Sequence, residues 1–180
     1  MTVENIRAAV RRLKKRYDEE EPEKMCQAMG VLVKRIPMGR EQEACKGFFL
    51  RQCRIRLIVV NADLPEKYQR IILAHELGHA VLHGRDSVER QFRDFSMLDE
   101  TSVYEYEANM FAAEFLLDDG EVQTLLREGL NFFCAAKALR VPPELLDFKC
   151  RALRRRGCAI DPPLYARSNF MKHIDRADRF

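Results

Sequence analysis

The stretch RIILAHELGHAVLH, residues 70–83, contains the pattern HExxH, formed by His75, Glu76 and His79. It lies in a segment that predicts a helix beginning near Pro65. Two histidines four residues apart lie on the same face of a helix, about 6 Å apart along its axis. The two imidazoles can therefore bind one metal ion.

The chemistry of zinc gives each residue of this motif a role. A catalytic zinc site has three protein ligands and leaves a position for water. Glu76 is rotated by about 100° from His75 around the helix, so it points at the water and not at the ion. A carboxylate there can accept a proton from water that attacks a carbonyl. The competing interpretation is chance, which produces HExxH in roughly one of a hundred such chains.

A third ligand must come from outside the motif. His83 lies about 12 Å from His75 along the helix axis, too far for both to reach one ion, so we assign it a supporting or structural role. The next predicted helix offers three carboxylates. On its helical wheel, Glu105 lies about 50° from the centre of the apolar stripe and Glu107 about 110°. Glu105 is therefore the better candidate, ahead of Glu107 and Glu114.

Glu105 also has a purely structural interpretation. Ser102 and Glu105 have the spacing of a capping box, in which the glutamate binds the backbone at the start of its helix. Both interpretations remain open from the residues alone. Asn109, one turn after Glu105, could orient a ligand through a hydrogen bond.

The rest of the chain predicts an α+β fold. A small antiparallel sheet packs with the motif helix and further helices, and the chain ends in a helical pair. A surface loop is expected over residues 84–100. The other expected helices cover 3–17, 23–29, 101–117, 121–128, 131–139 and 143–156, and the strands cover 31–36, 47–52 and 54–60.

Composition excludes several classes of protein. Hydrophobic residues make up 47% and charged residues 33% of the 180, which excludes a disordered or fibrous chain. No apolar run approaches the ~18 residues that span a bilayer. The first twenty residues carry charges of both signs and have no apolar core, so no secretory signal is expected. We therefore expect a cytoplasmic protein whose six cysteines are reduced.

The C-terminal quarter is basic. Residues 137–180 hold 11 Lys or Arg and 5 Asp or Glu. We divide the chain into a zincin-like metallopeptidase domain, 1–130, and a small basic helical region, 131–180, packed on it. Residues 136–146 are similar to a helix-turn-helix turn, but Arg140 stands where glycine is usual and two prolines open the second helix. This degenerate match predicts weak or absent DNA binding, and packing is the favoured role.

The motif helix and the segment EYEANMFAAE, residues 105–114, together resemble the ImmA/IrrE family of metallopeptidases. The strand at 57–61 and the segment at 47–50 resemble the sheet that precedes the motif in that family. The resemblance covers about residues 5–160. One departure is Leu117-Asp118, where the family commonly has Leu-Met-Pro; this affects the local helix end and not the metal site.

The resemblance implies a gluzincin-like site with zinc held by His75, His79 and Glu105, and with Glu76 as general base; manganese is an alternative metal. It also implies a function, the cleavage of a helix-turn-helix repressor that controls a phage, a mobile element or a stress regulon. Two alternatives remain: an anti-repressor that binds its partner without cutting it, and a DNA-binding regulator. Because a purely structural metal site needs no base, Glu76 favours the peptidase.

Overall fold

The computed structural model of the chain describes residues 1–41, 44–84, 101–160, 171 and 174, the side chains of 101 and 102 excepted. Within these ranges, seven helices and a three-stranded mixed sheet confirm the α+β class. The loop predicted over 84–100 lies, beyond Gly84, outside the described residues. The elements are α1 (Val3–Tyr17), α2 (Pro22–Ala28), β1 (Leu32–Ile36), β2 (Gly47–Gln52), β3 (Ile55–Asn61), α3 (Glu66–Leu82), α5 (Thr101–Leu116), α6 (Asp119–Arg127), α7 (Phe132–Ala138) and α8 (Pro143–Arg155).

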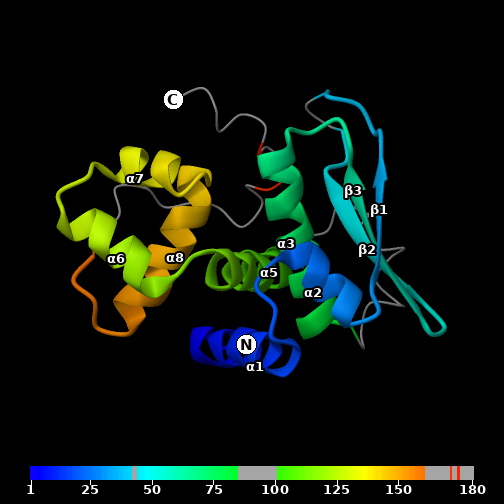
Figure 1. The fold of residues 1–180 in the computed structure, drawn as a ribbon, viewed down its shortest axis with the longest axis horizontal. Helices are drawn as coiled ribbons and strands as arrows, with labels where there is room; N and C mark the ends of the chain where they lie inside the picture. The colour runs from blue at the N-terminus through cyan, green and yellow to red at the C-terminus, as the bar shows by residue number, and fades with distance from the viewer. Residues whose placement is uncertain (42–43, 85–100, 161–170, 172–173, 175–180) are drawn as a thin grey trace.

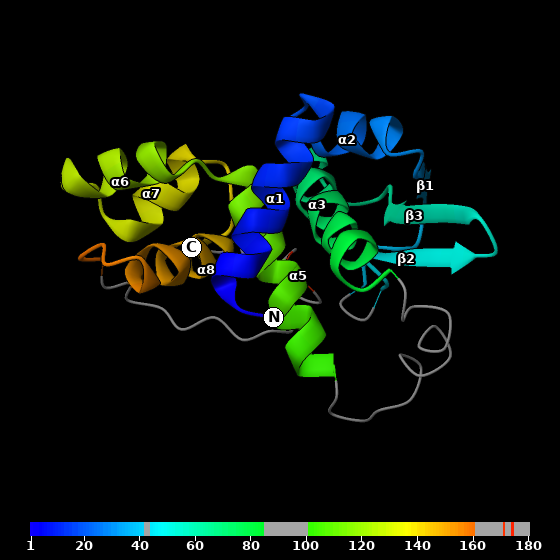
Figure 2. The same ribbon diagram turned by 90° about the horizontal axis from the view of Figure 1, so that it is seen from below.

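Helix α5 lies at the centre of the molecule. The sheet, α2 and α3 lie on one side of it, and α6, α7 and α8 lie on the other (Figures 1 and 2). Residues 108–113 of α5 are completely buried. The sequence predicts one apolar stripe on this helix, but Met110 and Ala113 lie outside that stripe and are buried too. Over residues 108–113, therefore, α5 is covered on every side and not along one stripe only.

The antiparallel sheet predicted from the sequence is only half correct. Strands β2 and β3 pair antiparallel, joined by a tight turn in which Cys53 has a φ of +53°. Strand β1 pairs with the other edge of β3, and this pair is parallel, so the strand order is β1-β3-β2. Ile36, which ends β1, and Gly47, which begins β2, both lie level with the end of β3, so the connection between them passes from one edge of the sheet to the other at that end. Strand β1 therefore runs opposite to β2 and parallel to β3.

Asn61, the last residue of β3, holds the connection between β1 and β2 in place. The side chain, which is completely buried, donates hydrogen bonds to the carbonyls of Gly39 at 2.8 Å and Cys45 at 2.9 Å. Its carbonyl oxygen accepts from the backbone nitrogens of Met38 and Asp63. All four contacts of this one amide are with backbone, so it holds the connection between β1 and β2 against the end of β3.

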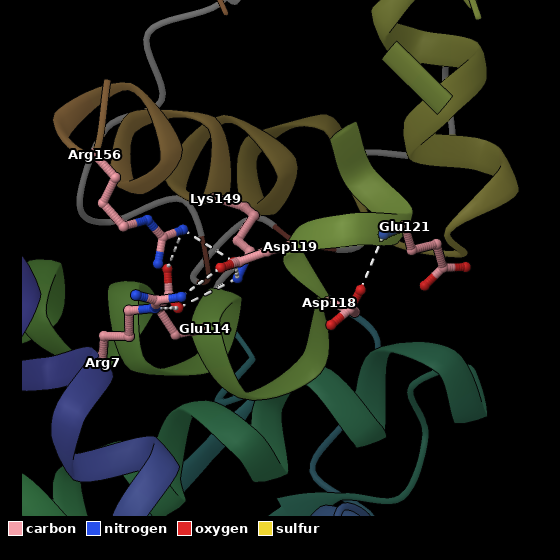
Figure 3. Close-up of polar contacts among 7 residues, drawn as sticks. All are labelled: Arg7, Glu114, Asp118, Asp119, Glu121, Lys149 and Arg156. Carbon is pink, nitrogen blue, oxygen red and sulfur yellow. Dashed lines mark hydrogen bonds and ion pairs between the residues drawn. The ribbon is translucent and has the colours of Figure 1, made fainter. Parts of the chain in front are cut away.

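An ionic cluster ties the N-terminal helix to the C-terminal pair (Figure 3). Lys149 of α8 is 1% exposed and contacts Asp119 at 2.6 Å and Glu114 at 3.3 Å. Arg7 of α1 and Arg156 contact Asp119 at 2.7 and 2.9 Å. Because Lys149 is buried, its charge depends on these carboxylates. The cluster therefore joins α1, α5, α6 and α8.

Replacing Asp119 with asparagine should destabilise the protein by about 3 kcal/mol, because it leaves the buried Lys149 with one carboxylate. Burial alone raises the pKa of Asp119, but the hydrogen bond from Lys149 and the charges of Lys149, Arg156 and Arg7 outweigh it and lower the pKa. The stabilisation is thus complete above the ordinary pKa of about 3.9 and is lost as pH falls through the lower pKa of the folded state. Urea unfolding between pH 3 and 7 measures both effects.

Asp118→Asn is the matched control for this prediction. Asp118 caps α6 by accepting a hydrogen bond from the backbone nitrogen of Glu121 at 3.0 Å, and asparagine caps helices equally well. The control should change the free energy of unfolding by less than about 0.5 kcal/mol. Equal losses in the two variants would contradict the role given to the cluster.

Two further findings concern membrane-spanning helices and the state of the cysteines. None of the helices in the described ranges combines the length and the apolar composition needed to cross a membrane. All six cysteines lie within these ranges and are free thiols. Burial raises the pKa of Cys26 and of Cys150 to about 12, so both stay protonated at neutral pH.

Candidate metal centre

Helix α3 places His75 and His79 on one face. Their Nε2 atoms are 3.2 Å apart, and the rings meet edge to face with centroids 4.8 Å apart. The four-residue spacing accounts for this arrangement. His75 is 3% exposed, whereas the side chain of His79 is 19% exposed. The pair is therefore closed on the His75 side and open on the His79 side.

Glu105 of α5 completes the group. One carboxylate oxygen lies 3.4 Å from Nε2 of His75, and the other lies 3.4 Å from Nε2 of His79. The three donor atoms lie within 4.8 Å of one another. Helix α5 begins at Thr101, so Ser102 lies inside the helix and not at its cap. The position of the carboxylate favours a role as ligand over the capping box.

The electrostatics of this group suit a cation. Burial alone raises the pKa of Glu105, but the contacts with His75 and His79 outweigh it and hold the pKa of this carboxyl well below its usual range. The group offers two imidazole nitrogens and one charged oxygen, the donors that zinc accepts in three-ligand catalytic sites. The donor set and its partial exposure therefore fit a divalent ion with room for one more ligand.

Glu76 lies apart from the three donors. It is 7% exposed and belongs to the next residue position of the same helix, which turns it towards the start of β2. A Cβ atom added to Gly47, the first residue of β2, would lie 3.6 Å from the Cγ atom of Glu76. The motif thus keeps the Glu76 carboxylate out of the group formed by the two histidines and Glu105, and its role as general base stays a prediction.

Two glycines let other elements approach α3 closely. A Cβ atom on Gly47 would lie 2.5 Å from a side-chain carbon of Ile72. A Cβ atom on Gly78 would lie 3.1 Å from Phe111 and 3.2 Å from Ala108 of α5. Because α3 and α5 touch at Gly78, within the motif, their packing sets the distance between the histidines and Glu105.

His83 and Glu107 form a contact that the sequence did not predict. His83 is not among the three donors, in agreement with its assignment above. Its Nε2 atom lies 2.9 Å from a carboxylate oxygen of Glu107, and both side chains are buried. The helical wheel placed Glu107 away from the apolar stripe, but its carboxylate is covered there by His83 and by the amino group of Met1, and α1 packs against α5. The recurrence of histidine at positions 75, 79 and 83 was the available signal.

Asn109 is completely buried on α5, and its proposed effect on a ligand stays a prediction.

Arg140, between α7 and α8, has a φ of +56°, the conformation that glycine adopts most easily at such a turn. Residues 145–150 of α8 are all buried. A helix buried on every side over these six residues cannot enter a DNA groove with them.

Comparison with known proteins agrees with the geometry. Residues 26–151 match the family described as the IrrE N-terminal-like domain, peptidase family M78. The chain is also similar to a protein of Bacillus phage phi105 called uncharacterized immunity region protein 2, with 34% identity over 155 residues. That similarity covers 83% of this chain and 95% of the phage protein. The match spans α3 and α5 with all three donors, and the chain belongs to the IrrE N-terminal-like family of M78 peptidases.

Proposed function

We propose that the protein is a zinc-dependent endopeptidase in which His75, His79 and Glu105 hold the ion and Glu76 is the general base. The observation that carries the proposal is the convergence of two imidazole nitrogens and one carboxylate from α3 and α5. A structural zinc site has four protein ligands, whereas a catalytic site has three. The three-donor group and membership in a peptidase family both support hydrolysis.

In this proposal, the three metal ligands and Glu76 have different roles in peptide-bond hydrolysis. The ion, when bound, polarises the carbonyl of the scissile peptide bond. Glu76 accepts a proton from the water that attacks this carbonyl and passes it to the amine that leaves. The partial exposure of His79 and Glu105 leaves an approach for the substrate on that side. Manganese, which also accepts carboxylate and imidazole, is the alternative ion.

We propose a helix-turn-helix repressor as the substrate. Two observations support it: the IrrE-like family, and the similarity to a protein named for the immunity region of a phage. The test mixes the purified protein with a small helix-turn-helix protein encoded beside its gene, with zinc, with manganese or with a chelator. Metal-dependent appearance of two fragments by mass spectrometry is expected. Loss of operator binding without cleavage would favour the non-catalytic anti-repressor instead.

We further propose that residues 131–180 form a small region that packs on the peptidase part and does not read DNA. Arg154 and Arg155 are exposed, whereas Arg156 is engaged with Asp119 and Glu114. A few exposed arginines give only non-specific affinity that depends on salt.

The protein should accordingly bind a random DNA duplex weakly, and binding should fall by at least tenfold between about 50 and 200 mM salt. Fluorescence anisotropy with two unrelated duplexes measures this, and a duplex carrying the repressor's operator is the comparison. A tight complex restricted to the operator would support the DNA-binding regulator.

A further inference from the structure

A line of contacts leads from the candidate metal centre into the protein. Nδ1 of His79 lies 3.1 Å from Nδ1 of His83, and Nε2 of His83 lies 2.9 Å from Oε2 of Glu107. His83 is 8% exposed and Glu107 is 4% exposed, so water does not readily replace these contacts. The line begins on the ring nitrogen of His79 that faces away from His75 and Glu105.

The geometry permits one arrangement of protons when His79 binds an ion. Nε2 of His79 faces the other two donors, so it carries the lone pair and Nδ1 carries the proton. Nδ1 of His79 then donates to Nδ1 of His83, which must accept. The proton of His83 is therefore on Nε2, where it is donated to the Glu107 carboxylate. Each of the three groups in the line thus has a defined donor or acceptor role.

The two histidines of the motif differ in what holds them. Nδ1 of His75 has no hydrogen-bond partner among the described residues, but that side chain is almost fully buried and packing fixes its ring. His79 is more exposed and depends on its second nitrogen for orientation. A metal-binding histidine that donates its other N–H to an acceptor is held in one tautomer and one ring orientation.

Further contacts fix the far end of the line. The ring of Tyr104 packs edge-on against His83, with centroids 4.8 Å apart and planes at 86°. The second oxygen of Glu107 is contacted by the amino group of Met1. His83 and Glu107 are therefore held by groups that do not belong to the candidate metal centre.

We propose that His83 and Glu107 are positioning residues for the metal ligand His79, acting through the hydrogen-bond line His79–His83–Glu107. This inference rests on the proposed function. The line holds His79 in the tautomer whose Nε2 is free to bind, and orients its ring towards His75 and Glu105. Neither His83 nor Glu107 touches the ion or the substrate.

Metal affinity tests the proposal directly. His83→Phe keeps a buried ring but removes the acceptor, and it should weaken zinc binding by about 10- to 100-fold in a titration against a competing chelator. His83→Asn offers an amide oxygen near the position of Nδ1 and should restore part of the affinity. Glu107→Gln keeps an acceptor without its charge and should weaken binding by about tenfold.

Glu114→Gln is the matched control for Glu107→Gln. Glu114 is also a buried carboxylate on α5, but it belongs to the ionic cluster with Lys149. This control should lower the free energy of unfolding of the metal-free protein and leave zinc affinity within about twofold. If Glu114→Gln and Glu107→Gln weaken zinc binding equally, general loosening of α5 explains the loss and the proposal is wrong.

A second measurement needs no variant. Long-range nitrogen–proton NMR spectra of the zinc-loaded protein identify the protonated nitrogen of each histidine. The proposal expects the Nδ1–H form for His79 and the Nε2–H form for His83; an Nδ1–H form for His83 overturns it. If the unaltered protein binds no ion, both the proposed function and the positioning role fail. If the unaltered protein binds zinc and His83→Phe binds it equally well, the positioning role alone fails.

Discussion

Glu76→Gln is expected to lower the rate of substrate cleavage by about 10²-fold or more while one metal ion stays bound per chain. Glutamine has the shape of glutamate but cannot accept the proton of the attacking water. The histidines and Glu105 are unchanged, and Glu76 lies outside this three-donor group. The measurements are metal content after dialysis and the initial rate of cleavage of the partner repressor.

The control for this prediction is Glu66→Gln. Glu66 lies in the first turn of the same helix and is exposed, so its loss should leave both metal content and rate unchanged. Undiminished cleavage by Glu76→Gln would refute the general-base mechanism. Loss of the ion from Glu76→Gln would instead show that this carboxylate takes part in metal binding.

Glu105→Ala should lose its metal and all detectable cleavage, the largest effect expected on binding. The change removes the one carboxylate among the three donors and leaves only the two imidazoles, which come from one helix. Two ligands on one helix do not complete a zinc site. With the protein and free zinc both at micromolar concentration, atomic emission should show that bound zinc falls from one ion per chain to near zero.

Glu107→Ala is the comparison for this second prediction. It should still bind one ion at saturating zinc, because its carboxylate reaches His83 and not the three donors. Circular dichroism and the unfolding midpoint of each metal-free variant establish that α5 is still formed. A folded Glu105→Ala protein that keeps full zinc while Glu107→Ala loses it would reverse the roles of the two glutamates.

The candidate site was predictable from the sequence where its geometry is local. His75, Glu76 and His79 belong to one helix, and a four-residue spacing decides which side chains share a face. Glu105 followed from the apolar stripe of the next helix together with the family resemblance, because the stripe alone left the capping box open. The burial of Glu107 did not, because it depends on contacts with His83 and Met1 and on the packing of α1 against α5, all of them distant in sequence. Periodicity within one helix does not contain that information.

The fold shows the same division between local and distant causes. The hairpin of β2 and β3 and the bounds of most helices agree with the patterns of alternation, capping and glycine to within about two residues. The parallel direction of β1 was missed because alternation within a strand does not show which edge of β3 that strand joins, and β1 joins the edge opposite β2. The burial of Lys149 could not be predicted either, because it depends on ion pairs with Glu114 and Asp119, which lie on other helices.

The close approach of α3 and α5 at Gly78 determines which changes of sequence the donor group should tolerate. The donors belong to two helices that hold each other directly, through a surface where a single added methyl group would press on Phe111 and Ala108. The separation of the donors is thus a property of two packed helices and not of the segment that joins them in sequence. Insertions or deletions between the two helices are therefore expected to leave the donors in place, whereas position 78 favours the smallest side chain.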